Sequence, residues 1–225
     1  MKTPVLQMSI YDWSEERFEI QSIGDDILVK FVPPHVNIFY CFGGVVLVLL
    51  LFQVVSGVAL TMYYSATVVS GFSSVKGIVG VLYLGWLNRS IHRWCGSCMN
   101  LGIILHMFRL YFTGGFKKAR ELIWMTGIIL GCVAVIFGVT GYSLAWDQVA
   151  YWACKIVTSV PEGLDKLVSR IGLVLVLTIR GGFSVCSGRL VRLYSIHTLV
   201  FPMLTLILSG LHFSMLRKQG ISGPL

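Results

Sequence analysis

Charged residues are scarce in this chain: only 12% of its 225 residues are Asp, Glu, Lys or Arg, whereas 56% are hydrophobic. A soluble globular domain carries about twice that share of charge, so the composition excludes this class and indicates a membrane protein. The 18 Lys and Arg residues form no run, which argues against a nucleic-acid-binding surface. We therefore expect membrane lipid around the chain and no nucleic acid partner.

Linkers and processing signals are also lacking. No Pro-, Gly- or Ser-rich stretch divides the sequence, and no short apolar segment followed by small residues resembles a cleavable signal peptide. The six cysteines fall mostly in or near apolar segments, which argues against a secreted disulfide framework. We therefore predict a single membrane domain over residues 1–225, inserted through its internal spans.

Long apolar segments are what the sequence has instead. A bilayer core about 30 Å thick requires roughly 20 apolar residues in a helix, and three segments meet this plainly. A fourth does so only if the arginines that bound it extend toward the membrane surface. We predict an all-α, integral membrane four-helix bundle with helices over residues 37–64, 86–112, 122–146 and 193–216. Four spans place both termini on one side, but Lys and Arg divide evenly between the sides, so the positive-inside rule gives no orientation.

Two further segments are expected to lie on the membrane surface. Residues 11–31 mix large apolar side chains with charged ones, which predicts an amphipathic surface helix that ends before Pro33 and Pro34. Between the third and fourth spans, residues 171–179 form an apolar run that is too short to cross a bilayer. We predict an interfacial helix there.

Four of the five histidines lie in the second and fourth predicted spans: His92, His106, His197 and His212. The first two are 14 residues apart, about 21 Å along a helix and within about 40° of one face. The other two are 15 apart, about 22 Å and about 60°. Such helices can present two His–His pairs at two depths, which suits six-coordinate haem iron. One membrane histidine is often only a hydrogen-bonding group between helices, but four in matched pairs favour haem.

Glycines in the first and third predicted spans repeat the 14-residue spacing, as Gly43 with Gly57 and Gly127 with Gly141. Small residues at helix interfaces would let a flat haem approach closely. Arg89 and Arg93 flank His92 and could pair with haem propionates. The alternative for either arginine is ordinary positioning at the end of a span.

These residues resemble the cytochrome b6 family of oxygenic photosynthesis along almost the entire chain. The motifs that carry the resemblance include Val32-Pro-Pro-His-Val-Asn-Ile-Phe-Tyr-Cys41, Arg89-Ser-Ile-His-Arg-Trp94, Phe137-Gly-Val-Thr-Gly-Tyr-Ser-Leu144 and Arg217-Lys-Gln-Gly-Ile-Ser-Gly-Pro-Leu225. The resemblance implies a haem-carrying electron-transfer subunit of a plastoquinol–plastocyanin reductase, not catalytic alone. It would move electrons from a lumenal quinol site to a stromal quinone site and contribute to proton translocation. The implied location is the thylakoid membrane, chloroplast rather than cyanobacterial, with both termini stromal.

Carried over residue by residue, the resemblance implies a lumenal haem on His92 and His197 and a stromal haem on His106 and His212. It further implies that Cys41 holds a third haem, c-type in its attachment, through one thioether and without the usual Cys-x-x-Cys-His motif. The stromal proton route would use Asp26 with Arg217, and Arg217 is also expected among the cofactor-binding residues.

The implied substrate is plastoquinone. The implied partners are subunit IV, cytochrome f, the Rieske iron–sulfur protein and small subunits, in a homodimeric complex. The sequence departs from the family pattern at Ala145, where the family usually has proline, and over residues 163–189. Because that connection helps to frame the quinol pocket, the sequence does not predict the geometry of the pocket.

Two other classes remain possible on the sequence. A four-helix dihaem anchor of a respiratory dehydrogenase or hydrogenase would share bis-histidine haems, but not the covalent haem or the terminal motifs. A haem-free transporter or scaffold would use the histidines for hydrogen bonding or proton relay.

Overall fold

The computed structural model describes residues 10–28, 32–161, 163, 171–180 and 187–223, and the regular structure within these ranges is entirely helical. The chain divides into two compact units, Met1–Val36 and Asn37–Leu225, which are described separately below. The helical content and the long apolar helices of the second unit confirm the predicted all-α membrane fold.

In the first unit, two short helices replace the single surface helix that the sequence predicts. These are α1 (Ile10–Phe18) and α2 (Ile20–Leu28). The break falls at Glu19, whose φ of 48° lies in the left-handed region and cannot continue a right-handed helix. The carboxylate of Glu15 accepts a hydrogen bond from the backbone N–H of Gln21 at 2.8 Å, which satisfies a free donor at the start of α2.

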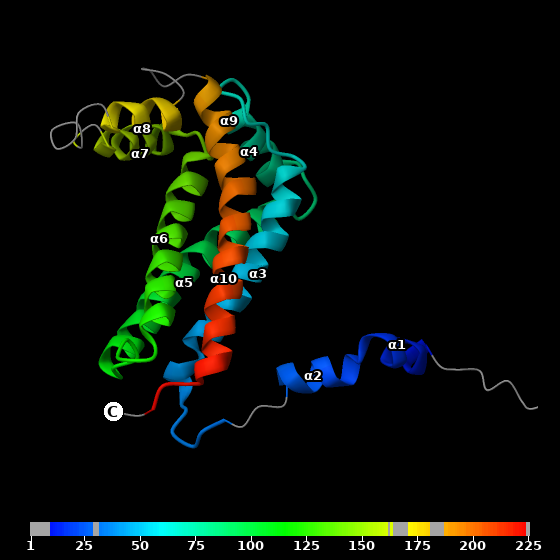
Figure 1. Cartoon of the computed structure of the whole chain (residues 1–225). Helices are drawn as coiled ribbons and strands as arrows, with labels where there is room; N and C mark the ends of the chain where they lie inside the picture. The colour runs from blue at the N-terminus through cyan, green and yellow to red at the C-terminus, as the bar shows by residue number, and fades with distance from the viewer. Residues whose placement is uncertain (1–9, 29–31, 162, 164–170, 181–186, 224–225) are drawn as a thin grey trace, which may run out of the picture. The chain divides into compact units, whose positions relative to one another are not determined.

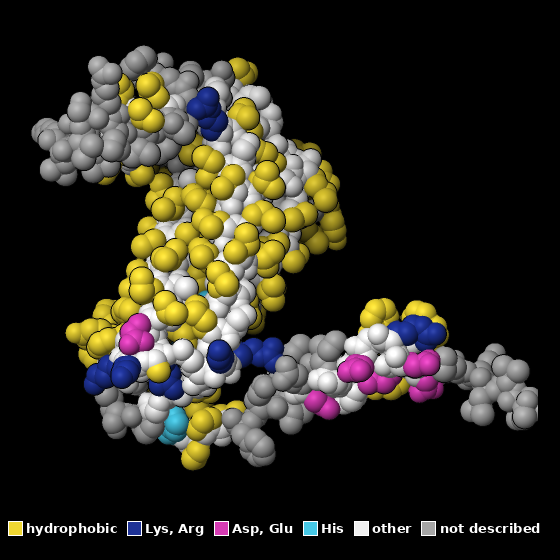
Figure 2. All heavy atoms as spheres, viewed as in Figure 1, with side chains coloured by type: hydrophobic (Ala, Val, Ile, Leu, Met, Phe, Trp, Pro, Cys, Tyr) yellow, Lys and Arg dark blue, Asp and Glu magenta, His cyan; other side chains and the backbone are white. Residues whose placement is uncertain are grey.

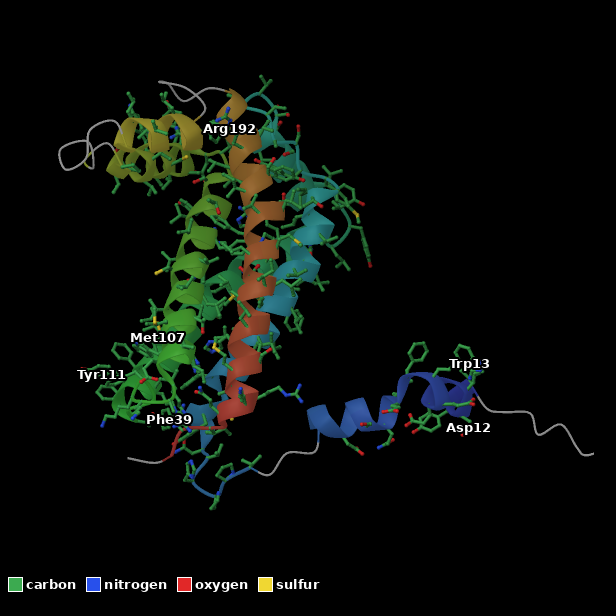
Figure 3. The ribbon with its side chains drawn as sticks, viewed as in Figure 1. Asp12, Trp13, Phe39, Met107, Tyr111 and Arg192 are labelled. Atoms are coloured by element: carbon green, nitrogen blue, oxygen red, sulfur yellow. The ribbon has the colours of Figure 1, made fainter. Side chains whose placement is uncertain are left out.

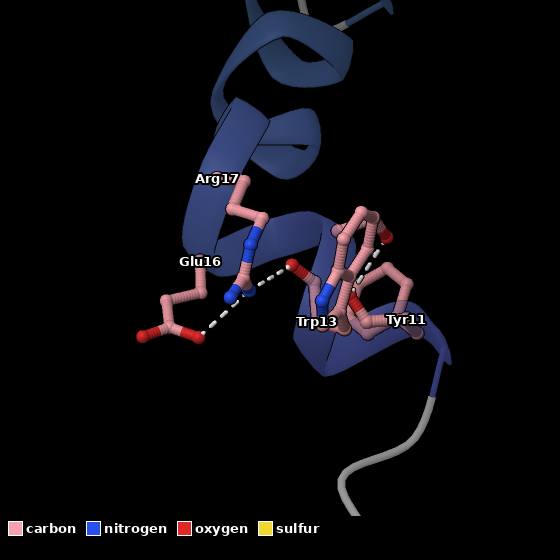
Figure 4. A network of polar contacts seen from close by, with 5 residues as sticks. Tyr11, Trp13, Glu16 and Arg17 are labelled. Atoms are coloured by element: carbon pink, nitrogen blue, oxygen red, sulfur yellow. Dashed lines mark hydrogen bonds and ion pairs between the residues drawn. The ribbon is translucent and has the colours of Figure 1, made fainter.

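Helix α1 is held by local side-chain contacts (Figure 4). The guanidinium of Arg17 donates to the carbonyl oxygen of Trp13 at 3.0 Å and forms an ion pair with Glu16 at 3.1 Å. The same guanidinium lies 4.6 Å from the centre of the Trp13 ring. Because these groups are exposed, the ion pair contributes little to stability; its effect is to order the last turn of α1.

The second unit is built around four long helices (Figure 1). They are α3 (Phe42–Thr61), α5 (Gly85–Phe112), α6 (Glu121–Ser143), and a continuous helix made of α9 (Ser187–Ser195), η3 (Ile196–Val200) and α10 (Phe201–Gln219). Helix α3 packs against α5, and α6 packs against α10. Helix α5 also contacts α6, so that the two helical pairs form one bundle.

Three helices among the described residues are long and apolar enough to cross a membrane: Ile38–Thr61, Glu121–Ser143 and Gly188–Gln219. Helix α5 has 28 residues, about 42 Å of helix, but it carries more polar side chains. This agrees with the sequence analysis, in which the second segment is the least apolar. Figure 2 shows hydrophobic side chains over the flank of the bundle, while Lys and Arg gather where α5 turns into α6.

Several helix ends differ from the prediction. The third helix was expected to reach residue 146, but α6 ends at Ser143, and tight turns follow up to Trp146, which has a φ of 51°. The first span begins with a 3₁₀ turn, η1 (Ile38–Cys41), before α3. The fourth begins earlier than expected because α9 continues into it. Such ends depend on hydrogen bonds of single residues, which hydrophobic periodicity does not reveal.

The connections lie at the two ends of the bundle. Helices α7 (Gln148–Ser159) and α8 (Ile171–Arg180) lie across the end where α6 stops, and α8 occurs where the interfacial helix was predicted (Figure 1). The carboxylate of Asp147 caps α7 by accepting from the N–H of Ala150 at 2.7 Å. The connection between α3 and α5 holds a further helix, α4 (Gly71–Gly80). Figure 3 shows Arg192 at this end, with Phe39 and Tyr111 at the opposite end.

Candidate functional site

Each of the four histidines of the bundle packs against a glycine of the neighbouring helix. A Cβ atom on that glycine would lie 2.6 to 3.3 Å from the ring Cε1 of the histidine. The contacts pair Gly57 with His92 at 3.2 Å, Gly43 with His106 at 3.0 Å, Gly141 with His197 at 2.6 Å and Gly127 with His212 at 3.3 Å. Larger residues would push the rings away, since carbon atoms in contact prefer about 3.5 to 4.0 Å. The structure therefore brings together the two sets of residues that the sequence analysis selected.

Three of the histidines are also hydrogen-bonded to a hydroxyl, always that of the residue immediately before the glycine. The bonds join Ser56 Oγ to His92 Nδ1 at 2.9 Å, Thr140 Oγ1 to His197 Nδ1 at 3.1 Å and Thr126 Oγ1 to His212 Nδ1 at 3.0 Å. The sequence analysis missed these hydroxyls. The signal that could have found them is the dipeptide Ser/Thr-Gly, which occurs at three of the four glycines.

The direction of these bonds follows from where each hydroxyl proton goes. Ser56, Thr126 and Thr140 each donate their hydroxyl proton to the backbone carbonyl oxygen four residues earlier. A hydroxyl has one proton, so its oxygen must accept from Nδ1–H of the histidine. The Nε2 atom of the neutral ring then carries the lone pair. Three of the histidines are thus held in the tautomer that binds a metal through Nε2.

His106 is the exception. Its Nδ1 is buried, and the described residues offer it no hydrogen-bond partner. The residue before its glycine is Phe42, which has no hydroxyl.

The first histidine pair, His92 and His197, faces across the bundle. The ring centroids are 6.3 Å apart, and the ring planes cross at 75°. Two metal–imidazole bonds of about 2 Å each, with half a ring on either side, give a separation of about 6 Å. The spacing of the first pair therefore fits one metal atom held between two imidazoles.

The second histidine pair, His106 and His212, lies further along the same two helices. The ring contact of His92 with His197 supports the first pairing expected from the sequence. The pairing of His106 with His212 stays a prediction. At both pairs, each histidine ring meets a glycine and no bulky side chain at that point. The space beside the rings therefore fits a flat macrocycle.

A π-helical turn, η3, contains His197. The N–H of Phe201 bonds to the carbonyl of Ile196, five residues earlier, so this turn holds one residue more than an α-helical turn. Pro202 follows directly, and its missing N–H and its ring disfavour a regular α-helical turn before it. The extra residue accounts for the 15-residue spacing of His197 and His212. The angle of about 60° expected from a uniform α-helix therefore does not apply here, and His197 and His212 each meet a glycine of the 14-residue pair Gly141 and Gly127.

The structure adds an arginine that the sequence analysis missed. Arg109 follows His106 by three residues, as Arg89 precedes His92 by three. Its guanidinium lies 3.5 Å from the centre of the Tyr40 ring. Its Nε and Nη2 atoms are buried and have no hydrogen-bond partner among the described residues, so the group has donors to offer to an anion.

The predicted arginines lie nearby. Arg89 is half-buried and Arg93 is exposed on α5, and within the described ranges neither guanidinium forms a hydrogen bond or an ion pair. Arg217 is exposed near the end of α10.

Two predicted residues lie outside the histidine sites. Cys41 is an exposed free thiol in η1, with its Sγ 3.9 Å from the carbonyl oxygen of Asn37. Asp26 belongs to α2, and its side chain falls outside the described part of the structure.

Comparison with known proteins gives consistent results. The family profile described as Cytochrome b/b6/petB matches residues 27–220. The chain is 66% identical to "Cytochrome b6" of Heterocapsa triquetra, and 59% identical to those of Porphyra purpurea and Pyropia yezoensis. Each match covers 96% of this chain and 99% of the relative. A chain of a "Hyperthermophilic respiratory Complex III" superposes with a TM-score of 0.88 at 32% identity; the match covers 96% of this chain but only 56% of that one.

Proposed function

Since this chain belongs to the cytochrome b/b6 family, it is a haem-carrying electron-transfer subunit of a cytochrome b6f complex, and we propose that its two histidine pairs are the axial ligands of two b-type haems. The observation that carries the proposal is the orientation of the imidazoles. Three hydroxyl oxygens hold Nδ1 as the donor and leave Nε2 free to bind iron. A proton relay would require rings that exchange donor and acceptor roles, which these bonds oppose.

When bound, each haem supplies an iron that changes its oxidation state by one electron and has no open axial position for substrate. The residues of the chain hold and shield it. The histidines fix its depth in the membrane, the four glycines make room for its edge, and the apolar helices around it exclude water. The 14-residue spacing sets the two sites about 21 Å apart along the helices.

We infer that the arginines bind the haem propionates. Arg89 and Arg93 lie within one turn of His92, and Arg109 lies one turn after His106. A guanidinium binds a carboxylate through two parallel hydrogen bonds. Buried donors without a partner, as on Arg109, are costly unless an acceptor is supplied, which supports this role. Arg217 is proposed to bind cofactor at the same end.

We also propose that Cys41 binds a third haem through a single thioether. In support, its thiol is free and exposed at the start of the first span. The test is in-gel haem staining of the purified complex after full denaturation. A stained band of this chain that disappears in Cys41→Ala and persists in the control Cys98→Ala is expected. Staining that persists in Cys41→Ala would place the attachment elsewhere.

The chain is a multi-pass protein of the thylakoid membrane, as its relatives indicate. We propose a chloroplast origin, stromal termini, plastoquinone as the substrate, and a homodimeric complex with subunit IV, cytochrome f, the Rieske iron–sulfur protein and small subunits. Asp26 with Arg217 is proposed as the stromal proton route. The single membrane domain over residues 1–225, with its four spans, also stays a prediction.

The haem proposal is tested by a reduced-minus-oxidised spectrum of the purified complex. Two b-type components are expected. Both haem signals must stay with this chain when the subunits are separated under mild conditions. A complex that contains this chain without any b-type signal would contradict the proposal and favour a haem-free transporter or scaffold.

A further inference from the structure

The two histidine pairs differ in one contact that bears on how tightly each site holds an electron. In the first pair, both histidines donate Nδ1–H to a hydroxyl oxygen, from Ser56 and from Thr140. In the second pair, only His212 does so, through Thr126. His106 has a buried Nδ1 without a partner among the described residues.

The difference arises from one position in a repeated arrangement. Helices α3 and α5 keep the same register at both sites, since Gly43 contacts His106 and Gly57 contacts His92. The residue before the glycine is Ser56 at one site and Phe42 at the other. Phe42 therefore stands where a hydroxyl would meet His106.

A hydrogen bond from Nδ1–H to an oxygen makes the imidazole a more basic ligand through Nε2. A more basic ligand stabilises the oxidised iron more than the reduced iron, and hydrogen bonding around a haem is one of the means by which a protein sets its potential. The first pair, with two such bonds, should therefore favour the oxidised state more than the second pair, with one.

We propose that Phe42, by leaving His106 without a hydroxyl acceptor, raises the midpoint potential of the haem held by the second histidine pair. The inference rests on the proposed function, because it concerns haems held by these pairs. Each reduction adds one electron to one iron and breaks no bond.

The charge of the nearby arginines does not by itself distinguish the two sites. Each pair has an arginine three residues from its α5 histidine, Arg89 for His92 and Arg109 for His106. A cation favours the reduced state at either site, so the two arginines act in the same direction at both. A hydroxyl facing the histidine of α5 is the contact that the first site has, from Ser56, and the second lacks at Phe42.

The test is a potentiometric titration of the b-type absorbance in the purified complex. In Phe42→Thr, the midpoint potential of the second site should fall while that of the first stays unchanged. Phe42→Leu, which adds no acceptor, should leave both unchanged. We expect up to a tenfold change in the ratio of reduced to oxidised haem at a given potential, about 59 mV for one electron.

The converse variants keep the inference testable if Phe42→Thr fails to assemble. Ser56→Ala should raise the midpoint of the first site, and Ser56→Thr, which keeps the hydroxyl, should not. The inference is overturned, with both haems bound, if the midpoint potential of the second site falls no further in Phe42→Thr than in Phe42→Leu. It is also overturned if the midpoint potential of the first site does not rise in Ser56→Ala. A wild-type complex without b-type haem would instead contradict the proposed function.

Discussion

The two histidine pairs share their glycine contacts but differ in their hydrogen-bond partners. At both, a glycine of one helix meets the Cε1 edge of a histidine on the next. The first pair adds two hydroxyl partners and a π-helical turn, whereas the second has one hydroxyl and the half-buried cation Arg109 near it. The shared part makes room for a haem and supplies its ligands, and the parts that differ can set the properties of each haem independently.

The largest effect on haem content should come from replacing a histidine ligand, because the haem of that site is then lost while the other site keeps its haem. His92→Leu or His197→Leu should abolish the haem of the first pair and impair assembly, since a large unfilled space then remains in the bundle. His106→Leu or His212→Leu should abolish the haem of the second pair. Haem content and the two midpoint components in difference spectra measure this. Retention of both components in any variant would contradict the pairing.

A graded effect should come from the glycines, because the space beside each ring differs. Alanine at Gly141 would place Cβ 2.6 Å from His197, at Gly43 3.0 Å from His106, at Gly57 3.2 Å from His92, and at Gly127 3.3 Å from His212. Haem loss should therefore be largest for Gly141→Ala and smallest for Gly127→Ala, at a cost of about 1–3 kcal/mol each.

The matched controls for this series are Gly44→Ala and Gly210→Ala. Gly44 lies in α3 beside Gly43, and Gly210 lies in α10, the helix that carries His212; at neither does any atom lie within 4 Å of an added Cβ. These controls should retain both haems. If the controls lose as much haem as the four variants, the contact with the histidine ring is not what requires glycine.

The smallest effect should come from the bonds that close each end of the bundle. Near the first pair, Tyr64 donates its hydroxyl to the carbonyl oxygen of Leu144 at 2.7 Å and stacks on Tyr194. Tyr64→Phe keeps the stack and should lower stability by about 1 kcal/mol. Thermal release of the haem of the first pair measures the loss, and the exposed Tyr63→Phe is the control.

Burial raises the pKa of the Tyr64 phenol, and the neighbouring Tyr194 adds to this shift. The hydroxyl therefore stays protonated throughout the neutral range, and the effect of Tyr64→Phe should not vary with pH there.

Near the second pair, Arg120 donates to the carbonyl of Ile221 at 3.2 Å. It is more exposed, so Arg120→Met should destabilise that end less. An equal loss at both ends would show that burial does not govern these bonds.

Much of the fold and part of the site could be predicted from the sequence. The four long helices occur close to the expected residues because bilayer thickness sets the length of an apolar segment. The limits of α1, α2 and α6 could not be predicted, since they depend on a left-handed residue at Glu19 and on tight turns after Ser143. In the site, the predicted glycines and histidines meet, whereas the hydroxyls and Arg109 were not foreseen.

The sequence by itself determined the membrane class, the four histidines and their spacing along each helix, and the matching glycines, because residue number fixes height and direction on a single regular helix. Only the tertiary structure decided which glycine meets which histidine, which hydroxyl fixes each imidazole, and how a π-helical turn absorbs the extra residue before His212. These are contacts between helices, or departures from regular helix, and they arise when the helices pack together.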